Sequence, residues 1–437
     1  MNFARNASST ALTQVVRGLF GFVFGVLIAR WLSEADRGVF AVVATVGVFA
    51  EHLSHLGMRF TVIYRMTRPA GSRPRAVGAA LEWTVLAFAV ICALAWLFAA
   101  PLRERVLLGA EPLVLGLALA LAAADLFSGL SDAVARGIDR FDLRNANQIA
   151  IPLVSLAAGA VALLGLGCGL VGTLVAVAAA RLALLAGMGA LTLRQSGLEW
   201  TLDGSELGES LRFGVKGWLQ VLLAKVHERV DVVVMALLRL DPVQIAVYAI
   251  AVNVVDRLRV VPEAVSASLL PTLATMEPER TGEYTARVTR HTVVWVAASG
   301  AALALLAPLL LPFFYGERYA PAVAPFLVLL PATAMLTVRT MVSNYFIAVG
   351  RPGFNAWVQA GAVCANVAAN LFAIPRWGIV GAAAASVLSY GVETVATVLA
   401  FRRAAQRSLR DTLVPSRGDL ADYAGQARRL RERLGGA

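Results

Sequence analysis

The chain has 437 residues, of which 58% are hydrophobic and only 15% are charged, and its mean hydropathy is +0.70. A soluble protein usually carries about a quarter charged residues, so this composition excludes an ordinary soluble protein. The net charge of +11 does not predict a nucleic-acid partner, because the basic residues lie mainly in loops and in the tail and form no patch interleaved with aromatic residues.

Apolar runs of about 18 to 25 residues recur along the chain, which is the length needed to cross about 30 Å of hydrocarbon. Each run is expected to be helical, because a backbone N–H in lipid must find its partner inside its own segment. We predict an all-α integral membrane protein with twelve transmembrane helices. They are expected at residues 10–31, 38–60, 77–100, 112–135, 148–166, 170–192, 213–238, 243–273, 291–314, 321–349, 354–374 and 378–401.

Basic residues divide unevenly between the two sets of connections. The rich set holds Arg65, Arg68, Arg73, Arg75, Arg136, Arg140, Arg144, Arg280, Arg287, Arg290 and Arg351. The opposite set holds Arg30, Arg37, Arg103, Arg105, Arg239, Arg318 and Arg376. Loops rich in arginine stay in the cytoplasm, so we predict a multi-pass protein of the cytoplasmic (inner) membrane with both chain ends inside.

The two halves of the chain resemble each other in order and spacing. Leu32–Ala41 returns as Leu240–Ala249, and Gly169–Gly172 returns as Gly378–Gly381. Such a repeat predicts two six-helix lobes around a central cleft, and six spans per copy give both copies the same orientation. The predicted divisions are an N-terminal lobe at 1–195, a cytoplasmic linker at 196–212, a C-terminal lobe at 213–402 and a tail at 403–437.

The tail is different in kind from the rest. Apolar residues recur in it at helical spacing between Leu420 and Leu434, and four arginines crowd the same stretch. This pattern is typical of a cationic amphipathic helix lying on the anionic inner leaflet. A frayed, solvated chain end is the alternative.

Several cations lie inside predicted spans, where a charge costs about 2.5–3.5 kcal/mol on insertion scales. Arg17 shares one face of the first span with Gly21 and Gly25. Arg339 has no acid within a helical turn, and Arg257 has none except across its helix. The seventh span carries Lys216 on one polar stripe and Lys225 on the other, and the sequence leaves open which stripe faces the cleft. These five residues are the predicted substrate-binding cations.

Duplicated membrane units of this kind belong mostly to transporters, and a transporter needs an energy source. A membrane-embedded carboxyl can load and release a proton as a cleft opens and closes. Glu51, Asp125 and Asp256 are the candidate coupling acids. Asp256 also stands three residues before Arg259, so mutual neutralisation is an equally simple explanation. The cysteines Cys92, Cys168 and Cys364 are scattered, and the four histidines form no constellation in the sequence, so we predict no metal site and no cofactor.

Several motifs resemble those of the Wzx-like oligosaccharide flippases of the MOP superfamily. These are the stretch Ala29–Phe40, the pair Leu56-Gly57 with Arg59, and the stretch from Asn344 to Arg403, which contains Ile374-Pro-Arg-Trp-Gly-Ile-Val-Gly381. The resemblance implies a V-shaped exporter with alternating access and an undecaprenyl-pyrophosphate-linked oligosaccharide as its substrate. One position departs from the family: His55 stands where members more often carry an aspartate before Leu-Gly.

The leading hypothesis is therefore a flippase rather than an enzyme, in which arginines meet the pyrophosphate and membrane lipids surround the polyprenyl tail. A polysaccharide polymerase and glycosyltransferases are its expected partners. A multidrug or cation antiporter of the same superfamily is the main alternative, but it favours an acidic pocket and the first span offers only Arg17. A polytopic glycosyltransferase or polymerase, a scaffold, and a peptidoglycan-precursor flippase are further alternatives.

Overall fold

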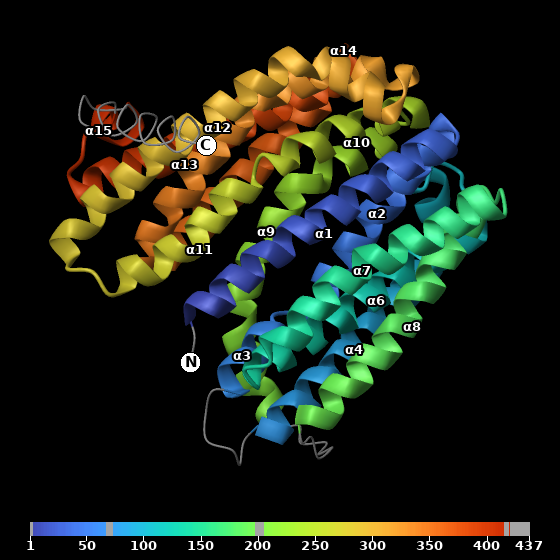
Figure 1. Cartoon of the computed structure of the whole chain (residues 1–437), viewed down its shortest axis with the longest axis horizontal. Helices are drawn as coiled ribbons and strands as arrows, with labels where there is room; N and C mark the ends of the chain where they lie inside the picture. Colours follow the sequence, from blue (N-terminus) through green and yellow to red (C-terminus); the bar gives the residue numbers. More distant parts are fainter. Residues whose placement is uncertain (1–2, 67–72, 197–204, 415–418, 420–437) are drawn as a thin grey trace, which may run out of the picture. The chain divides into compact units, whose positions relative to one another are not determined.

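The computed structural model describes residues 3–66, 73–196, 205–414 and 419, and this part of the chain is helical without a strand (Figure 1). The helices are α1 (Phe3–Trp31), α2 (Glu34–His55), α3 (Met58–Met66), α4 (Arg73–Leu97), α5 (Ala99–Pro101), α6 (Pro112–Gly137), α7 (Phe141–Ala160), α8 (Leu170–Ser196), α9 (Ser205–Leu237), α10 (Pro242–Arg257), α11 (Val260–Ala274), α12 (Pro278–Tyr315), α13 (Val323–Ala348), α14 (Pro352–Ala405) and α15 (Leu409–Leu413). Short π or 3₁₀ turns occupy Leu102–Val106, Val161–Gly165 and Glu317–Ala322.

The helices cover the predicted spans, but α1, α7, α9 and α12 begin well before them, and two spans are broken. The second predicted span divides into α2 and α3 at Leu56 and Gly57, whose φ angles are 39° and 83°. The eighth divides into α10 and α11 between Arg257 and Val260. Within the described residues, nine helices are long and apolar enough to cross a membrane, so the protein is a multi-pass membrane protein. The number of twelve transmembrane helices stays a prediction.

Helix α14 contains two of the predicted spans, joined at Gly378. This glycine has φ 53° and ψ −134°, which is not a helical conformation. Its left-handed φ favours glycine, because a side chain there meets the backbone. A Cβ atom on Gly381 would overlap the carbonyl oxygen of Ala373. Residues eight apart in one straight helix would be about 12 Å apart, so the chain must turn back on itself at Gly378.

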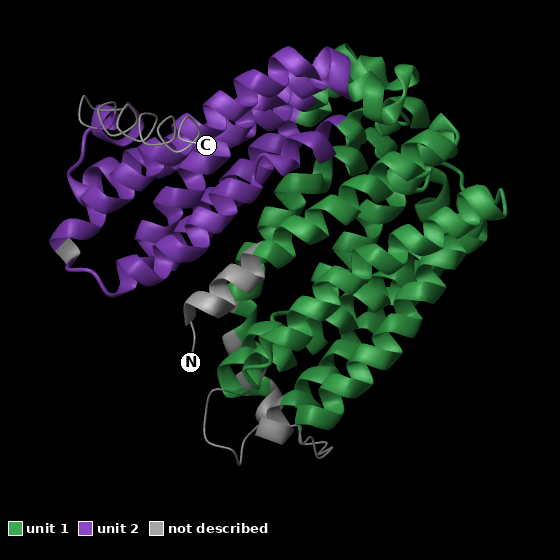
Figure 2. Ribbon diagram, viewed as in Figure 1, with its two compact units in different colours: residues 1–250, 311–322, 370–382 green, residues 251–310, 323–369, 383–437 purple. Residues whose placement is uncertain are grey.

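Contacts divide the chain into two compact units (Figure 2). Unit 1 comprises residues 1–250, 311–322 and 370–382, and unit 2 comprises residues 251–310, 323–369 and 383–437. Inside unit 1, α6 packs on α8 and α1 packs on α7; inside unit 2, α11 packs on α13. The limits of the predicted lobes at 195 and 213 stay a prediction. Part of the predicted linker is helical, because α9 already begins at Ser205.

The core of unit 1 includes a cluster in which α3 packs on α4 and α6, around Met58, Val62, Met66, Val77 and Leu130. The core of unit 2 is more aromatic, with Tyr345, Phe346 and Phe401 buried together. The ring centroids of Tyr345 and Phe401 lie 4.9 Å apart at a nearly perpendicular angle, a favourable edge-to-face geometry.

Two arginines of unit 1 that the charge count placed outside the cytoplasm bind the ends of helices. Arg30, at the end of α1, donates through Nε to the carbonyl oxygen of Phe314 at 2.7 Å. Arg318 in turn donates to the carbonyl oxygens of Ala29 and Leu32, at 2.9 Å for Leu32. The last carbonyls of a helix lack intrahelical partners and carry partial negative charge. Arg30 therefore stabilises the C-terminal end of α12, and Arg318 stabilises that of α1.

The turn at Gly378 gives a stability prediction. Replacing Gly381 with alanine forces Cβ onto the backbone of Ala373, and overpacking of this kind costs about 1–3 kcal/mol. We expect the Gly381→Ala variant to lower the apparent melting temperature of the detergent-purified protein. The matched control is Gly361→Ala in the same helix, where a Cβ atom meets nothing within 4 Å. It should be neutral or slightly stabilising, and an equal loss in both variants would contradict the proposed backbone turn.

Candidate functional site

Glu51, near the end of α2, is the centre of a charged cluster in unit 1. Its carboxylate forms ion pairs with Arg59 of α3 and with His52, and the Glu51 side chain is 7% exposed. The Arg59 guanidinium also donates from Nη2 to the carbonyl oxygens of Asp125 and Leu126 in α6, at 3.2 and 3.1 Å. Gly129 leaves room for it, because a Cβ atom there would overlap the guanidinium. Arg59 therefore ties α2, α3 and α6 together.

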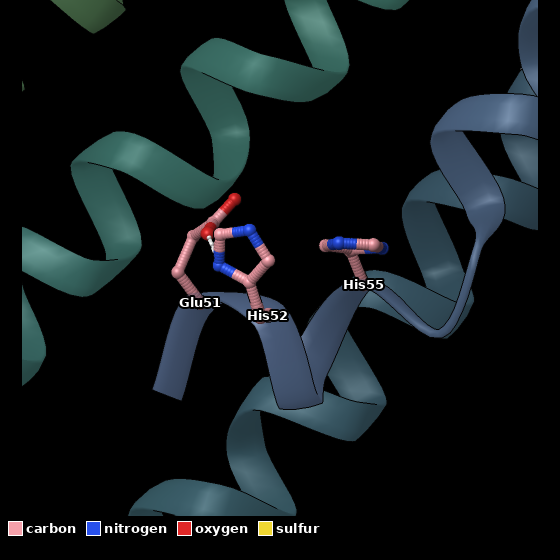
Figure 3. Close-up of side chains that lie close together, drawn as sticks. All are labelled: Glu51, His52 and His55. Atoms are coloured by element: carbon pink, nitrogen blue, oxygen red, sulfur yellow. Dashed lines mark ion pairs between the residues drawn. The ribbon is translucent and has the colours of Figure 1, made fainter. Parts of the chain in front are cut away.

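Two histidines stand beside this carboxylate (Figure 3). Glu51, His52 and His55 offer ligand atoms that all lie within 4.8 Å of one another, so the expectation that the histidines form no constellation was wrong. The residues fit a metal ion poorly, however. Nδ1 of His55 accepts the N–H of Gly57 at 3.1 Å, and Nδ1 of His52 lies 2.9 Å from the Val48 carbonyl oxygen. The guanidinium of Arg59 already neutralises Glu51, so an added cation would face a positive neighbour.

A second charged pair joins α6 to α8, with the Arg181 side chain 21% exposed and the Asp125 side chain 44% exposed. Nη1 of Arg181 donates to both oxygens of Asp125, at 3.0 and 3.1 Å, and Nε donates to Ser155 Oγ of α7 at 2.8 Å. Arg17 and Arg59 also lie close enough to Asp125 to act on it electrostatically. The structure thus brings three predicted residues, Arg17, Glu51 and Asp125, into one charged neighbourhood of unit 1.

Arg59 and Arg181 are not among the predicted site residues, although both lie in this cluster. In each contact the two residues come from different helices. Arg59 and Asp125 are 66 positions apart, and Arg181 and Asp125 are 56 positions apart. For Arg181, one feature of the sequence could have indicated this contact: it is a lone arginine within the apolar span at 170–192, where a charge needs a partner.

In unit 2, Arg339 of α13 pairs with Glu393 in the second half of α14. The Nε–Oε1 distance is 2.7 Å, and the Glu393 side chain is 2% exposed. Gln359, in the first half of α14, accepts a hydrogen bond from Arg339 Nη2. No acid lies within a turn of Arg339 in its own helix, so a cation without a partner was expected. That expectation was wrong, since the partner comes from another helical segment.

The two pairs are related under the predicted repeat. Asp125 and Arg181 belong to the predicted fourth and sixth spans, and Arg339 and Glu393 belong to the tenth and twelfth, which are their counterparts. The charges are exchanged: the fourth span carries the acid, whereas the tenth carries the arginine. In each half, a polar residue of the intervening span, Ser155 or Gln359, completes the contact.

The remaining predicted residues lie apart from these pairs. Arg259 forms ion pairs with Asp256 and Glu263, each at 3.5 Å, as the helical spacing predicted. Arg257 is exposed at the end of α10. Lys225 pairs with Glu228 at 2.8 Å, whereas the side chain of Lys216 lies outside the described part of the structure, as do Leu420 to Leu434 of the tail.

The two stripes of α9 have different surroundings. His227 and Asp231, which share the stripe of Lys216, are 2% and 4% exposed, and Tyr248 of α10 donates a hydrogen bond to the Asp231 carboxylate. His227 and Asp231 therefore face the interior of unit 1, whereas the Lys225 side chain is 36% exposed. Which stripe contacts substrate stays a prediction.

The arrangement of long apolar helices matches that of known membrane transporters. The chain is 10% identical to a structure of the lipid II flippase MurJ in an inward closed conformation, with a TM-score of 0.75 over 90% of this chain and 89% of that one. It is 15% identical to an inward-facing multidrug resistance MATE family transporter of the MOP superfamily, with a TM-score of 0.71 over 90% and 94%. For the Vibrio cholerae MATE transporter VcmN in the bent form, the identity is 15% and the TM-score 0.55 over 92% and 98%.

The sequence identifies the family more narrowly. The model of the family described as "Polysaccharide biosynthesis protein" matches residues 27–324, which is more than half of the chain. The chain therefore belongs to this polysaccharide biosynthesis family, and its fold is that of the MOP superfamily flippases and transporters. No curated protein matches the sequence.

The pair in unit 2 gives a second stability prediction. Removing only the arginine, in Arg339→Met, leaves Glu393 buried without its cation, which costs about 3–5 kcal/mol. We expect a large drop in apparent melting temperature. The double variant Arg339→Met/Glu393→Leu removes both charges and should recover most of the loss, because an apolar pair can replace a buried ion pair at little cost. A double variant as unstable as the single one would contradict the pairing.

Proposed function

We propose that this protein is a flippase that moves an undecaprenyl-pyrophosphate-linked oligosaccharide from the cytoplasmic to the outer leaflet of the cytoplasmic membrane by alternating access. The match to the polysaccharide biosynthesis family over residues 27–324 is the observation that carries the proposal. The likeness to the lipid II flippase MurJ supports it at the level of the fold.

The chemistry of the arginines in the predicted spans fits such a substrate. A polyprenyl tail can stay in lipid while the pyrophosphate crosses, so the protein must offer cations within the membrane. A guanidinium matches phosphate geometry with two parallel hydrogen bonds. Arg17, Arg257 and Arg339 are the proposed contacts, with Lys216 and Lys225 as secondary ones. Arg59 and Arg181 join them because they lie in the same charged neighbourhood as Arg17.

The ion pairs of Glu51 and Asp125 with arginines suggest how these acids could couple transport to proton uptake. Asp125 and Glu51 are each held by arginines, so an anionic substrate that competes for those arginines would free a carboxylate to take up a proton. Asp256 is engaged by Arg259 and is the third proposed acid. We further propose that both chain ends are cytoplasmic and that a polymerase and glycosyltransferases act on the same glycan.

The alternative is a multidrug or cation antiporter, which the likeness to MATE transporters keeps open. A cationic drug needs uncompensated acids in its site, whereas Glu51 and Asp125 are both paired with arginines. This pairing favours an anionic substrate. The two functions separate in one assay, because cells that express an antiporter accumulate less cationic dye, whereas a glycolipid flippase leaves dye accumulation unchanged.

The proposal predicts the effect of removing cations without destabilising the fold. We expect the combination Arg257→Ala with Arg339→Met/Glu393→Leu, expressed in place of the native chain, to lower surface polysaccharide at least about tenfold and to raise the lipid-linked precursor. A single charged hydrogen bond contributes about 1.5–3 kcal/mol, and about 1.4 kcal/mol is a factor of ten.

The matched control is Arg280→Ala, which removes an exposed arginine whose side chain is 78% exposed. It should export at the normal level. Unchanged surface polysaccharide in the triple variant, at equal protein level in the membrane, would show that Arg257 and Arg339 are not substrate contacts.

A further inference from the structure

One end of unit 2 contains a pocket where the end of α13 meets the beginning and the end of α14. Its volume is 330 Å³, which is at the lower end of the range of about 300–1,000 Å³ for small-molecule sites. The pocket is lined by Phe346, Arg351, Phe354, Ala400, Arg403 and Ala404. It is separate from the Arg339–Glu393 pair, since it shares no residue with it.

The floor of this pocket is apolar and well supported. The rings of Phe346 and Phe354 lie 4.4 Å apart between centroids, tilted by 38°. Phe346 is buried, and it packs in the same core cluster as Tyr345 and the fully buried Phe401. A ligand resting on this floor therefore meets side chains held in place by the core of unit 2.

The rim of the pocket is cationic. Arg351 and Arg403 are exposed, and within the described residues neither guanidinium has an ion-pair partner. Neighbouring acids are engaged elsewhere: Glu283 pairs with Arg287 and Arg407, and Asp419 pairs with Arg290. Asp411 is held by Ser408, whose hydrogen bond lowers the pKa of that carboxyl.

We propose that this pocket binds the headgroup of an anionic phospholipid, with the phosphate between Arg351 and Arg403 and the glycerol end on the aromatic floor. Guanidinium groups and phosphates are complementary in charge and geometry, and the floor favours an amphipathic ligand over a fully hydrated ion. Arg351 belongs to the arginine-rich connections that are predicted to be cytoplasmic, where the leaflet is anionic. The chain's own tail is a poor occupant, because it carries Arg428, Arg429, Arg431 and Arg433.

Native mass spectrometry of the full-length protein tests this site by titration with phosphatidylglycerol, with phosphatidylcholine as the neutral comparison. We expect the wild-type protein to bind one phosphatidylglycerol more tightly than any phosphatidylcholine. The Arg403→Gln variant should weaken this binding about fivefold, and the double variant Arg351→Gln/Arg403→Gln should weaken it roughly thirtyfold. These are the contributions expected of one arginine and of two arginines beside an anionic lipid.

The adjacent Arg402→Gln is the matched control, because Arg402 is also exposed and loses the same charge but does not line the pocket. It should bind as the wild type does. A loss equal to that of Arg403→Gln would show general surface attraction and overturn the site. Competition with inorganic phosphate distinguishes a lipid headgroup from a free phosphate ion as the ligand. Displacement of the lipid by phosphate at equal concentration would also overturn the proposed lipid site.

A second variant tests the cavity while it keeps every charge. Ala400→Trp places a large side chain in the pocket and should abolish the tight phosphatidylglycerol binding. Unchanged helical circular dichroism and elution volume show that the variants remain folded. Retention of full lipid binding by Ala400→Trp would mean that the pocket is not the binding site.

Discussion

The described structure depends on one constraint: a guanidinium group within an apolar helical protein must find a partner. Placing an unpaired charge in the bilayer costs several kcal/mol, whereas a paired and hydrogen-bonded charge is tolerated. Several kinds of partner occur within the described residues. Arg181 and Arg339 use a carboxylate from another helical segment, Arg30 uses a carbonyl at a helix end, and Arg259 uses acids one turn away. The first kind has the largest consequence, because it joins helical segments that are distant in the sequence.

The exchange of charges between the two predicted copies follows from the same constraint. A pair needs one acid and one base, but it does not matter which helix carries which, so a duplicated unit can reverse the pair while keeping the contact. Asp125 with Arg181 and Glu393 with Arg339 have this relationship. The polar neighbours Ser155 and Gln359 differ as well, and each meets the arginine of its own half. The two halves of the chain would then present different groups to a substrate even where their folds are alike.

Much of the fold was predictable, because the apolar runs located the helices, although α1, α7, α9 and α12 each begin in a polar stretch before the predicted span. The turn at Gly378 coincides with the first residue of the twelfth predicted span. The predicted spans ran through the breaks at Leu56-Gly57 and after Arg257, although polar residues flank both places. The ion pairs were missed for a different reason. Helical spacing finds partners three or four residues away, as it did for Arg259, whereas Glu393 is 54 positions from Arg339 and only the packing of helices brings them together.

An arginine with a structural partner still has the capacity to contact substrate. Guanidinium carries five N–H donors on three nitrogens. Arg181 uses Nε and Nη1 for Ser155 and Asp125, and within the described residues its Nη2 makes no hydrogen bond. Arg339 uses Nε for Glu393 and Nη2 for Gln359, and in the same part of the chain its Nη1 makes none. A phosphate oxygen that reached such a nitrogen would share the cation with a carboxylate, which keeps binding weaker than that of an unpaired arginine. Weak binding of this kind suits a transporter, because a substrate that is held too tightly on one side of the membrane cannot leave on the other.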